Sequence, residues 1–338
     1  DDKGSAMAIL EAVEELLRQG FEPQQTIYLA FGHDEEVGGF QGAKAISDLL
    51  AARKIQLEAT IDEGLVITEG VLDDMSRPVA LIGIAEKGFL NVELVARGEG
   101  GHSSMPPRKT AVGVLSSAIH KLQGSPMPGA IDGAVQQMFE YIGPEYGFGK
   151  KLVMANLWLF GGIVEGMLSK KTSTDAVLRS TIAPTMLEGS DKSNVLPQTA
   201  RAVVNVRIKP GDSKESVLAH FKKVIDDERV EIRGLGDEPV SPQPASSTRS
   251  RVFQTLMRSI RSLDPEIIVA PGLMIAYTDS RHYAPISEDI YRFLPFRYGP
   301  EDLTRLHGVD ERISVQGYQD AIRFYLLLFR SLAGDGSP

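Results

Sequence analysis

Apolar residues recur at helical spacing near the start of the chain and at strand-like spacing soon after it. Residues 4–20 carry one apolar face and end in glycine, so they are predicted to form a helix. That face consists of Ala6, Ile9, Leu10, Val13, Leu16 and Leu17. Three predicted strands follow, at residues 24–32, 57–64 and 79–88. Residues 39–54 are a predicted helix, and this alternation favours an α/β fold in which helices cover both faces of a parallel-rich sheet.

The pattern changes after residue 88. The next predicted strand alternates apolar and polar residues, which is typical of a sheet with one solvated face. The predicted elements of this part are strands at 89–98, 199–212 and 229–234 and helices at 111–124 and 213–227. They indicate a smaller α+β domain. Residues 124–175 interrupt it with apolar patches around Trp158 and Phe160, which could line an acyl pocket or form ordinary interdomain core, the commoner use of such residues.

The α/β pattern resumes after a linker rich in Pro and Ser at residues 237–248. The later elements are a helix at 249–262, strands at 266–272 and 291–296, and a helix at 314–333. We therefore predict a discontinuous catalytic domain, residues 1–88 plus 238–338. Residues 89–237 are predicted to be an inserted α+β lid domain with an extra segment at 124–175.

Composition narrows the classes of partner. Of the 338 residues, 42% are hydrophobic and 24% charged, and the net charge of -9 argues against a nucleic acid or an anionic membrane. Apolar runs such as residues 324–329 are far too short to span a membrane. The absence of cysteine excludes disulfides and thiolate metal sites.

Carboxylates cluster where predicted strands end. Glu35 and Glu36 follow the strand at 24–32, and the pair at 62–63 ends the next one. The carboxyl ends of parallel strands meet at one edge of the sheet, where ligands bind. Asp1 and Asp2 precede the first helix, and His307 lies in a loop before the last. Divalent cations would relieve the repulsion in a two-metal centre, but a solvated turn, a helix N-cap and a loop histidine are the ordinary alternatives.

Seven ordered motifs sharpen this interpretation. They are DDKGSAMAILEAVEELL, FGHDEEVGGFQGA, IDEG, GHSSMPP, SNVLPQTARAVVNVRIKPGD, TDSRHY and LHGVDERISV. Together they resemble the co-catalytic zinc exopeptidase and aminoacylase family, in particular its carboxypeptidase S branch with the N-fatty-acyl-amino-acid synthase/hydrolases. The resemblance runs from Asp1 to about Leu332. It implies a metallohydrolase that cleaves the amide bond next to a free carboxylate.

The resemblance also implies a metal-ligand set. Asp1 would bridge two divalent metal ions, zinc in the family, with manganese or cobalt also compatible with such ligands. Glu36 and His307 would bind the second metal. Glu63 would bind the first, with Asp62 as the alternative.

Six further residues match motifs of the family's active site. Glu35 is implied as the general base that takes a proton from water, and His102 as the group that polarises the scissile carbonyl. The implied substrate-binding residues are Asn194, Arg207, Asp279 and Arg281. The substrate would be a small molecule or short peptide with a free carboxylate, either an N-acyl amino acid or a Gly-X type peptide.

One motif of the family is missing. His-x-Asp on an earlier strand is not found in this sequence, so we expect the natural chain to start further upstream and the first metal site to be incomplete here. The alternative function is a catalytically impaired fragment or relative that binds carboxylated ligands without turnover. A homodimer through the inserted domain is a further implication of the resemblance. The compartment stays open: a secreted or vacuolar location is typical of the branch, and the cytoplasm remains an alternative.

Overall fold

The computed structural model describes residues 2–302 and 305–334, and within them not the side chains of 236–239. The α-helices are α1 Lys3–Arg18, α2 Ala43–Ala52, α3 Ala111–Gly124, α4 Gly133–Ile142, α5 Phe148–Met154, α6 Leu157–Leu168, α7 Thr172–Leu178, α8 Lys214–Ile225, α9 Arg251–Leu263 and α10 Val315–Ala333. The short 3-10 helices are η1 Glu35–Val37, η2 Gly143–Glu145 and η3 Asp279–Tyr283. The strands are β1 Leu57–Thr68, β2 Val79–Glu86, β3 Gly88–Arg97, β4 Gly101–His102, β5 Thr181–Glu188, β6 Val195–Leu196, β7 Thr199–Ile208, β8 Val230–Val240, β9 Ile268–Met274 and β10 Ser287–Tyr298.

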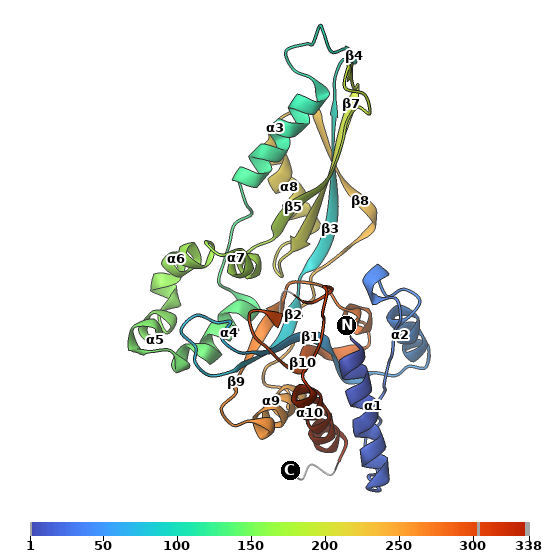
Figure 1. Ribbon diagram of the computed structural model, residues 1–338, viewed down its shortest axis with the longest axis vertical. Helices are drawn as coiled ribbons and strands as arrows, with labels where there is room; N and C mark the ends of the chain where they lie inside the picture. Colours follow the sequence, from blue (N-terminus) through green and yellow to red (C-terminus); the bar gives the residue numbers. More distant parts are fainter. Residues whose placement is uncertain (1, 303–304, 335–338) are drawn as a thin grey trace.

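A four-stranded mixed sheet forms the base of the molecule, in the order β1-β10-β2-β9. The pairs β1–β10 and β2–β9 are parallel, whereas β10 and β2 run antiparallel. Helices α1, α9 and α10 lie below this sheet in Figure 1, and the buried residues of these helices share one core with those of the strands. The predicted α/β class with parallel pairing is confirmed, although the sheet is less uniformly parallel than the sequence pattern indicated.

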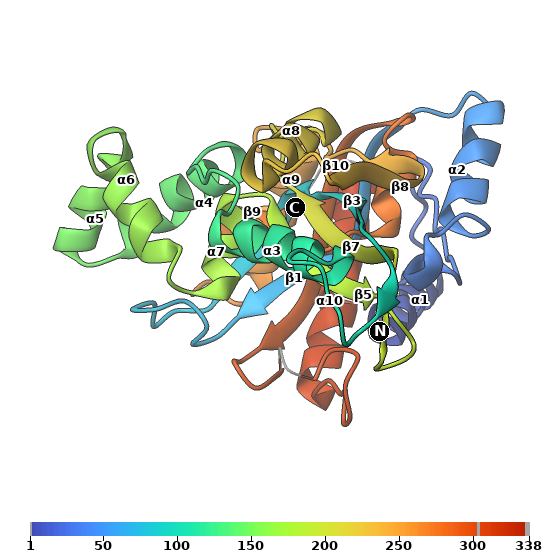
Figure 2. The same cartoon turned by 90° about the horizontal axis from the view of Figure 1, so that it is seen from above.

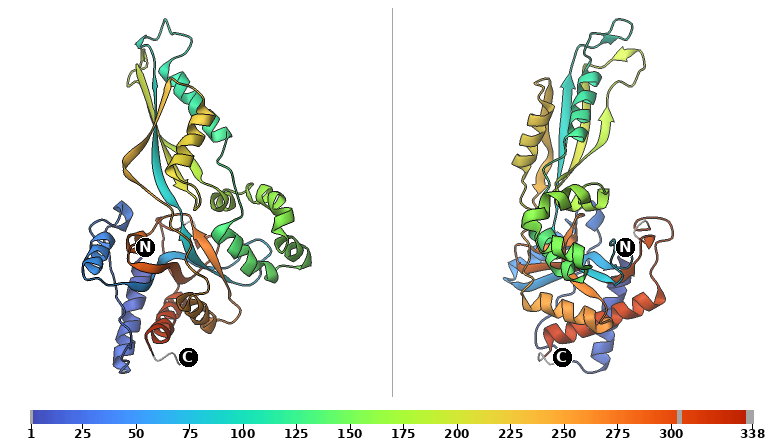
Figure 3. Two further views of the ribbon diagram at one scale, coloured as in Figure 1. Left: turned by 180° about the vertical axis from the view of Figure 1, so that it is seen from behind. Right: turned by 90° about the vertical axis from the view of Figure 1, so that its left-hand side faces the viewer.

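A second four-stranded sheet rises from the base, in the antiparallel order β5-β7-β3-β8. Helices α3 and α8 cover one face of it and enclose a separate core (Figures 1 and 3). This is the predicted α+β lid. Its strands come from residues 88–240, whereas those of the base come from residues 57–86 and 268–298. We interpret this arrangement as two domains with boundaries near residues 88 and 238, which stay a prediction.

The strand predicted at residues 24–32 is wrong for the structure described. The segment is not assigned to any strand, and Ile27, Tyr28, Leu29 and Phe31 are exposed. A strand exists only as part of a hydrogen-bonded ladder, and none of the recorded strand pairings includes this segment. Its residues favour a strand, but among the described residues no neighbouring strand pairs with them.

The extra segment forms a helical arm. Helix α4 packs against β9 and contributes to the core of the base, but α5 and α6 extend to one side of the molecule (Figures 1 and 2). Four large apolar side chains of α6 are exposed: Trp158, Leu159, Ile163 and Met167. The prediction of core is wrong for these four side chains, whereas Val164 is buried and Leu157 and Leu168 pack against the core of the base. The acyl pocket stays a prediction. In the described residues no single helix is long and apolar enough to cross a membrane, and the one pair that reaches this length, α5 with α6, is bent by 108°.

Substitution on this arm should cost little stability. Trp158 is 83% exposed, so Trp158→Ala is expected to change the free energy of unfolding by no more than about 0.5 kcal/mol. Phe139 on α4 is 6% exposed, and Phe139→Ala should cost about 3–5 kcal/mol. Urea denaturation of both variants checks the contrast. A loss of several kcal/mol for Trp158→Ala would mean that α6 is covered in solution.

Candidate active site

The Glu35–Glu36 pair lies on a tightly fixed turn. Both carboxylates of the pair belong to η1, which the side chain of Asp34 ties to the next segment by accepting the backbone N–H groups of Gln41 and Gly42 at 2.7 and 2.8 Å. Gly38 and Gly39 both have positive φ, which glycine adopts without strain. A Cβ at Gly39 would also collide with the Asp279 carboxylate. The sequence EEVGG therefore presents two glutamates where a longer helix cannot form.

A second pair of carboxylates lies at an irregularity within β1. Asp62 accepts hydrogen bonds from the backbone N–H of Glu63 at 2.9 Å and from that of Ser280 at 2.6 Å. A register shift between Asp62 and Leu65 interrupts the pairing with β10. Gly64 follows with a φ of 143° and faces Arg292 closely. The ladder is therefore irregular at the IDEG motif, where Glu63 is half-buried.

The carboxylates interact with one another. Burial raises the pKa of Glu63 to about 8, and repulsion from Asp62, Asp2 and Glu35 adds to this effect. Burial likewise raises the pKa of Glu35 to about 7, with further contributions from Glu36 and Asp279. Asp279 itself has a pKa raised to about 6, by burial and by Asp62. Glu35, Glu36, Glu63 and Asp279, distant in sequence, thus interact as one carboxylate cluster, and Arg281 partly offsets the repulsion at Glu35 and Asp279.

His307 lies beside this cluster. Its Nδ1 is 3.2 Å from a carboxylate oxygen of Glu36, and both side chains are exposed. This is the pairing that a shared metal would require. Asp1 lies outside the described residues, so its bridging role stays a prediction. Asp2 caps α1 by accepting the backbone N–H of Ser5, and burial raises its pKa.

Arg207 occupies the lid end that faces the base. Its guanidinium lies 5.0 Å from the ring centre of Phe89 and 5.4 Å from that of Tyr277. The Nη1 atom is buried and has no hydrogen-bond partner among the described residues. Leaving a buried charged donor unpaired is costly, and a carboxylate would satisfy its planar fork. The guanidinium of Arg207 therefore has the chemistry to bind a carboxylate, and its predicted role in binding substrate stays a prediction.

His102 and Asn194 are brought together, but at the opposite end of the lid. Strand β4 pairs with β6 beside Asn194, whose carbonyl accepts the N–H of Ser103 at 3.1 Å. Figures 1 and 3 show β4 at the tip, far from η1 and α1. Eight residues of β7 separate this tip from Arg207, which corresponds to about 27 Å of strand. In this arrangement His102 contacts Ser104 and does not face the carboxylate cluster.

Asp279 and Arg281 lie close to the glutamates, on η3. The Asp279 Oδ1 is buried without a partner among the described residues. Arg281 donates to the Gly38 carbonyl at 2.7 Å and lies 4.1 Å from the ring centre of Tyr277. Its contacts are thus with the protein itself, and its predicted role in binding substrate stays a prediction.

Four residues that the sequence interpretation did not single out support this site. They are Glu86, Tyr277, His282 and Arg292. Glu86 ends β2 and accepts both the backbone N–H and the hydroxyl of Thr278, while Arg292 pairs with the same carboxylate at 2.5 Å. The sequence contains a signal for three of these residues. Glu86 lies near the end of a predicted strand, Arg292 lies within the apolar run IYRFLPF, and His282 follows TDSR.

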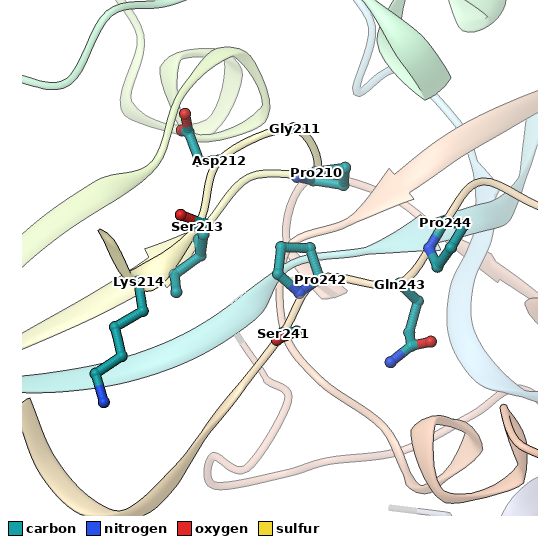
Figure 4. Close-up of a pocket in the computed structure, with 10 residues that line it drawn as sticks. Pro210, Gly211, Asp212, Ser213, Lys214, Ser241, Pro242, Gln243 and Pro244 are labelled. Atoms are coloured by element: carbon teal, nitrogen blue, oxygen red, sulfur yellow. The ribbon is translucent and has the colours of Figure 1, made fainter. Parts of the chain in front are cut away.

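A cavity of about 300 Å³ lies elsewhere, between the turn after β7 and the segment after β8 (Figure 4). It is lined mainly by Pro210, Gly211, Pro242 and Pro244, and none of the predicted site residues faces it. The candidate chemistry therefore belongs to the carboxylate cluster and not to this cavity.

The donor set fits divalent cations in its chemistry. Mutually repelling carboxylates with raised pKa values, together with the orphaned Asp279 oxygen, are groups that a cation would stabilise. Within the described ranges no three His, Asp or Glu side chains converge as a complete ligand shell. Oxygen and imidazole donors of this kind suit zinc, manganese or cobalt.

Comparison with known sequences decides the family. A profile of peptidase family M20/M25/M40 matches residues 1–331. The chain belongs to this peptidase family. This confirms the predicted resemblance. Members of this family generally bind divalent metal ions.

Relatives in the family include both predicted types. The chain is 43% identical to a probable carboxypeptidase S-like protein of Dictyostelium discoideum, over 98% of its length and 64% of the relative. It is 40% identical to an N-fatty-acyl-amino acid synthase/hydrolase of Danio rerio, again over 98% and 64%. This chain thus spans less than two thirds of the length of these relatives. An M20 metallo-carboxypeptidase of Sulfolobus solfataricus has the same fold, with a TM-score of 0.67 at 21% identity over 98% of this chain and 75% of that one.

Proposed function

We propose that this M20 protein hydrolyses the amide bond next to a free C-terminal carboxylate, in N-acyl amino acids or in Gly-X type peptides. The observation that carries the proposal is that Glu35, Glu63 and Asp279 each have a pKa raised by burial and by neighbouring carboxylates. The names of the relatives, carboxypeptidase S-like protein and N-fatty-acyl-amino acid synthase/hydrolase, support the substrate class.

Two divalent metals, zinc by family, would be held by Glu36 with His307 and by Glu63, with Asp1 as the predicted bridge. When bound, they supply Lewis acidity, which polarises a carbonyl oxygen and makes water more acidic. The cations would also neutralise the repulsion that raises the pKa of Glu63.

Glu35 would act as general base and then as general acid. A carboxylate whose pKa lies near neutrality can both accept and return a proton at working pH. It takes a proton from the attacking water as the C–O bond forms. It then gives that proton to the amide nitrogen as the C–N bond breaks, which leaves a carboxylic acid and a free amino acid.

Arg207 would select the substrate through its carboxylate. His102 and Asn194 would take part after the lid tip has approached a cluster, either by lid closure or from a second copy of the chain. Edge strands β5 and β8 of the lid sheet are available for such a homodimer, which we keep as part of the proposal.

The test measures release of free amino acid from oleoyl-phenylalanine and from N-blocked Gly-Leu, with zinc added. We expect turnover of at least one substrate, and a KM about 10- to 100-fold higher for Arg207→Met, because a charge-assisted pair is lost. Arg207→Lys should recover only part of the loss, since lysine lacks the planar fork.

Substrates with a C-terminal amide provide the control, because they should bind the wild type and Arg207→Met alike. Carboxylate-dependent binding without any turnover would favour the second candidate, a relative that binds ligands without catalysis. The incomplete metal-ligand shell of the described residues supports this candidate. Equal KM values for the acid and the amide would contradict the role of Arg207.

A further inference from the structure

Two side chains of the TDSRH segment contact the same backbone carbonyl. The Gly38 carbonyl accepts the Nη2–H of Arg281 at 2.7 Å and contacts Nε2 of His282 at 2.9 Å. A carbonyl oxygen can only accept, so the ring nitrogen that faces it carries the proton. Gly38 closes η1, the turn that presents Glu35 and Glu36. His282 is thus bonded to the end of the turn that holds the proposed base.

The same segment is also bonded to the second carboxylate pair. The N–H of Ser280 donates to Asp62 at 2.6 Å, beside Glu63. Thr278 is held by Glu86, and the hydroxyl of Ser47 donates to the carbonyl of His282 at 2.7 Å. Residues 278–282 therefore link the η1 turn to the Asp62–Glu63 part of β1 through hydrogen bonds.

The packing around His282 leaves little freedom. Its ring makes an edge contact with Phe40, at 5.8 Å between ring centres. A Cβ at Gly39 would collide with the Asp279 carboxylate and would lie only 3.2 Å from Nε2 of His282. The residue is thus held by contacts at its backbone carbonyl, its ring edge and its Nε2 atom. Through the contact of Nε2 with the Gly38 carbonyl, it restrains the η1 turn.

We propose that His282 is a positioning residue that, with Arg281, fixes the Glu35–Glu36 turn relative to Asp62 and Glu63. It touches neither metal nor substrate and acts through the Gly38 carbonyl. The consequence for metal binding and turnover rests on the proposed function, whereas the ordering of the turn does not. Partners that orient metal ligands through one hydrogen bond typically change metal affinity or activity 10- to 100-fold when they are lost.

The test compares three variants of the 338-residue chain. His282→Leu removes the donor, and His282→Gln keeps an N–H near the position of Nε2. His220→Leu is the matched control, because Nε2 of His220 also contacts a backbone carbonyl, that of Ser125, at 2.9 Å within the lid. The readouts are amide hydrogen exchange of residues 38–44 without metal, zinc affinity against a chelating dye, and the separate kcat and KM values.

We expect His282→Leu to accelerate exchange at residues 38–44 and to weaken zinc binding 10- to 100-fold. The value of kcat should fall by a similar factor while KM stays within about twofold, and His282→Gln should recover most of each loss. His220→Leu should lower stability without moving these readouts. The inference is overturned if exchange in the turn is unchanged in His282→Leu, or if His220→Leu produces the same losses. Wild-type protein that binds no zinc and turns nothing over would refute the proposed function alone, because the exchange measurement still decides the positioning role.

Discussion

Glu35→Gln is expected to lower kcat/KM for the amide substrate by about 10²–10⁴-fold while the zinc content stays at the wild-type level. The amide side chain is nearly isosteric with the carboxylate but cannot accept and return a proton. Because the pKa of Glu35 is raised to about 7, its carboxyl group can take up and release a proton near neutral pH. The substitution removes this group. Metal analysis by plasma emission and steady-state kinetics on the same preparation check both halves.

Glu36→Gln is the neighbouring control. Glu36 contacts His307, so its substitution should lower zinc content and turnover together, in contrast to Glu35→Gln. Retained turnover in Glu35→Gln would refute the assignment of the base. Loss of zinc in both variants would instead indicate that the two adjacent glutamates share one role as ligands.

The local pattern predicted most helices well. Apolar spacing places the helix at residues 111–124 where α3 lies, and it finds α1 within two residues at either end. Helix periodicity depends on neighbours three and four residues apart, which a sequence displays directly. A strand needs a partner that may be far along the chain, and residues 24–32 fail as a strand for that reason.

The carboxylate pairs were predictable, but the residues that hold them were not. Glu35 and Glu63 could be found because adjacent carboxylates follow apolar runs in the sequence, although residues 24–32 form no strand and Glu63 lies inside β1. His282 contacts Gly38 across 244 positions, and Glu86 contacts Thr278 across 192. No short-range pattern encodes such distances. The apolar run of α6 is the converse case, since hydrophobicity alone does not say whether a partner covers it.

The buried pair of Glu86 and Arg292 is expected to give the largest stability effect. The two side chains are 2% and 1% exposed, and their ion pair measures 2.5 Å. Arg292→Met leaves the carboxylate of Glu86 buried without its cation, which should cost about 3–5 kcal/mol. Arg251→Met, which breaks an exposed pair with Glu58, should cost no more than about 1 kcal/mol.

The pH dependence of Arg292→Met gives the decisive readout. Burial already raises the pKa of Glu86, and Arg292 is the main influence that lowers it, so the variant should raise it further. A carboxyl group whose pKa is higher in the folded state than in the unfolded state binds more protons when folded, and its contribution to stability is lost as pH rises through the folded value. Urea denaturation from pH 5 to pH 8 should therefore show the deficit of Arg292→Met growing with pH. Adding Glu86→Gln removes the charge, keeps an acceptor for Thr278, and should restore much of the stability with a flat profile. A deficit independent of pH would mean that Arg292 stabilises the base through packing and not through its charge.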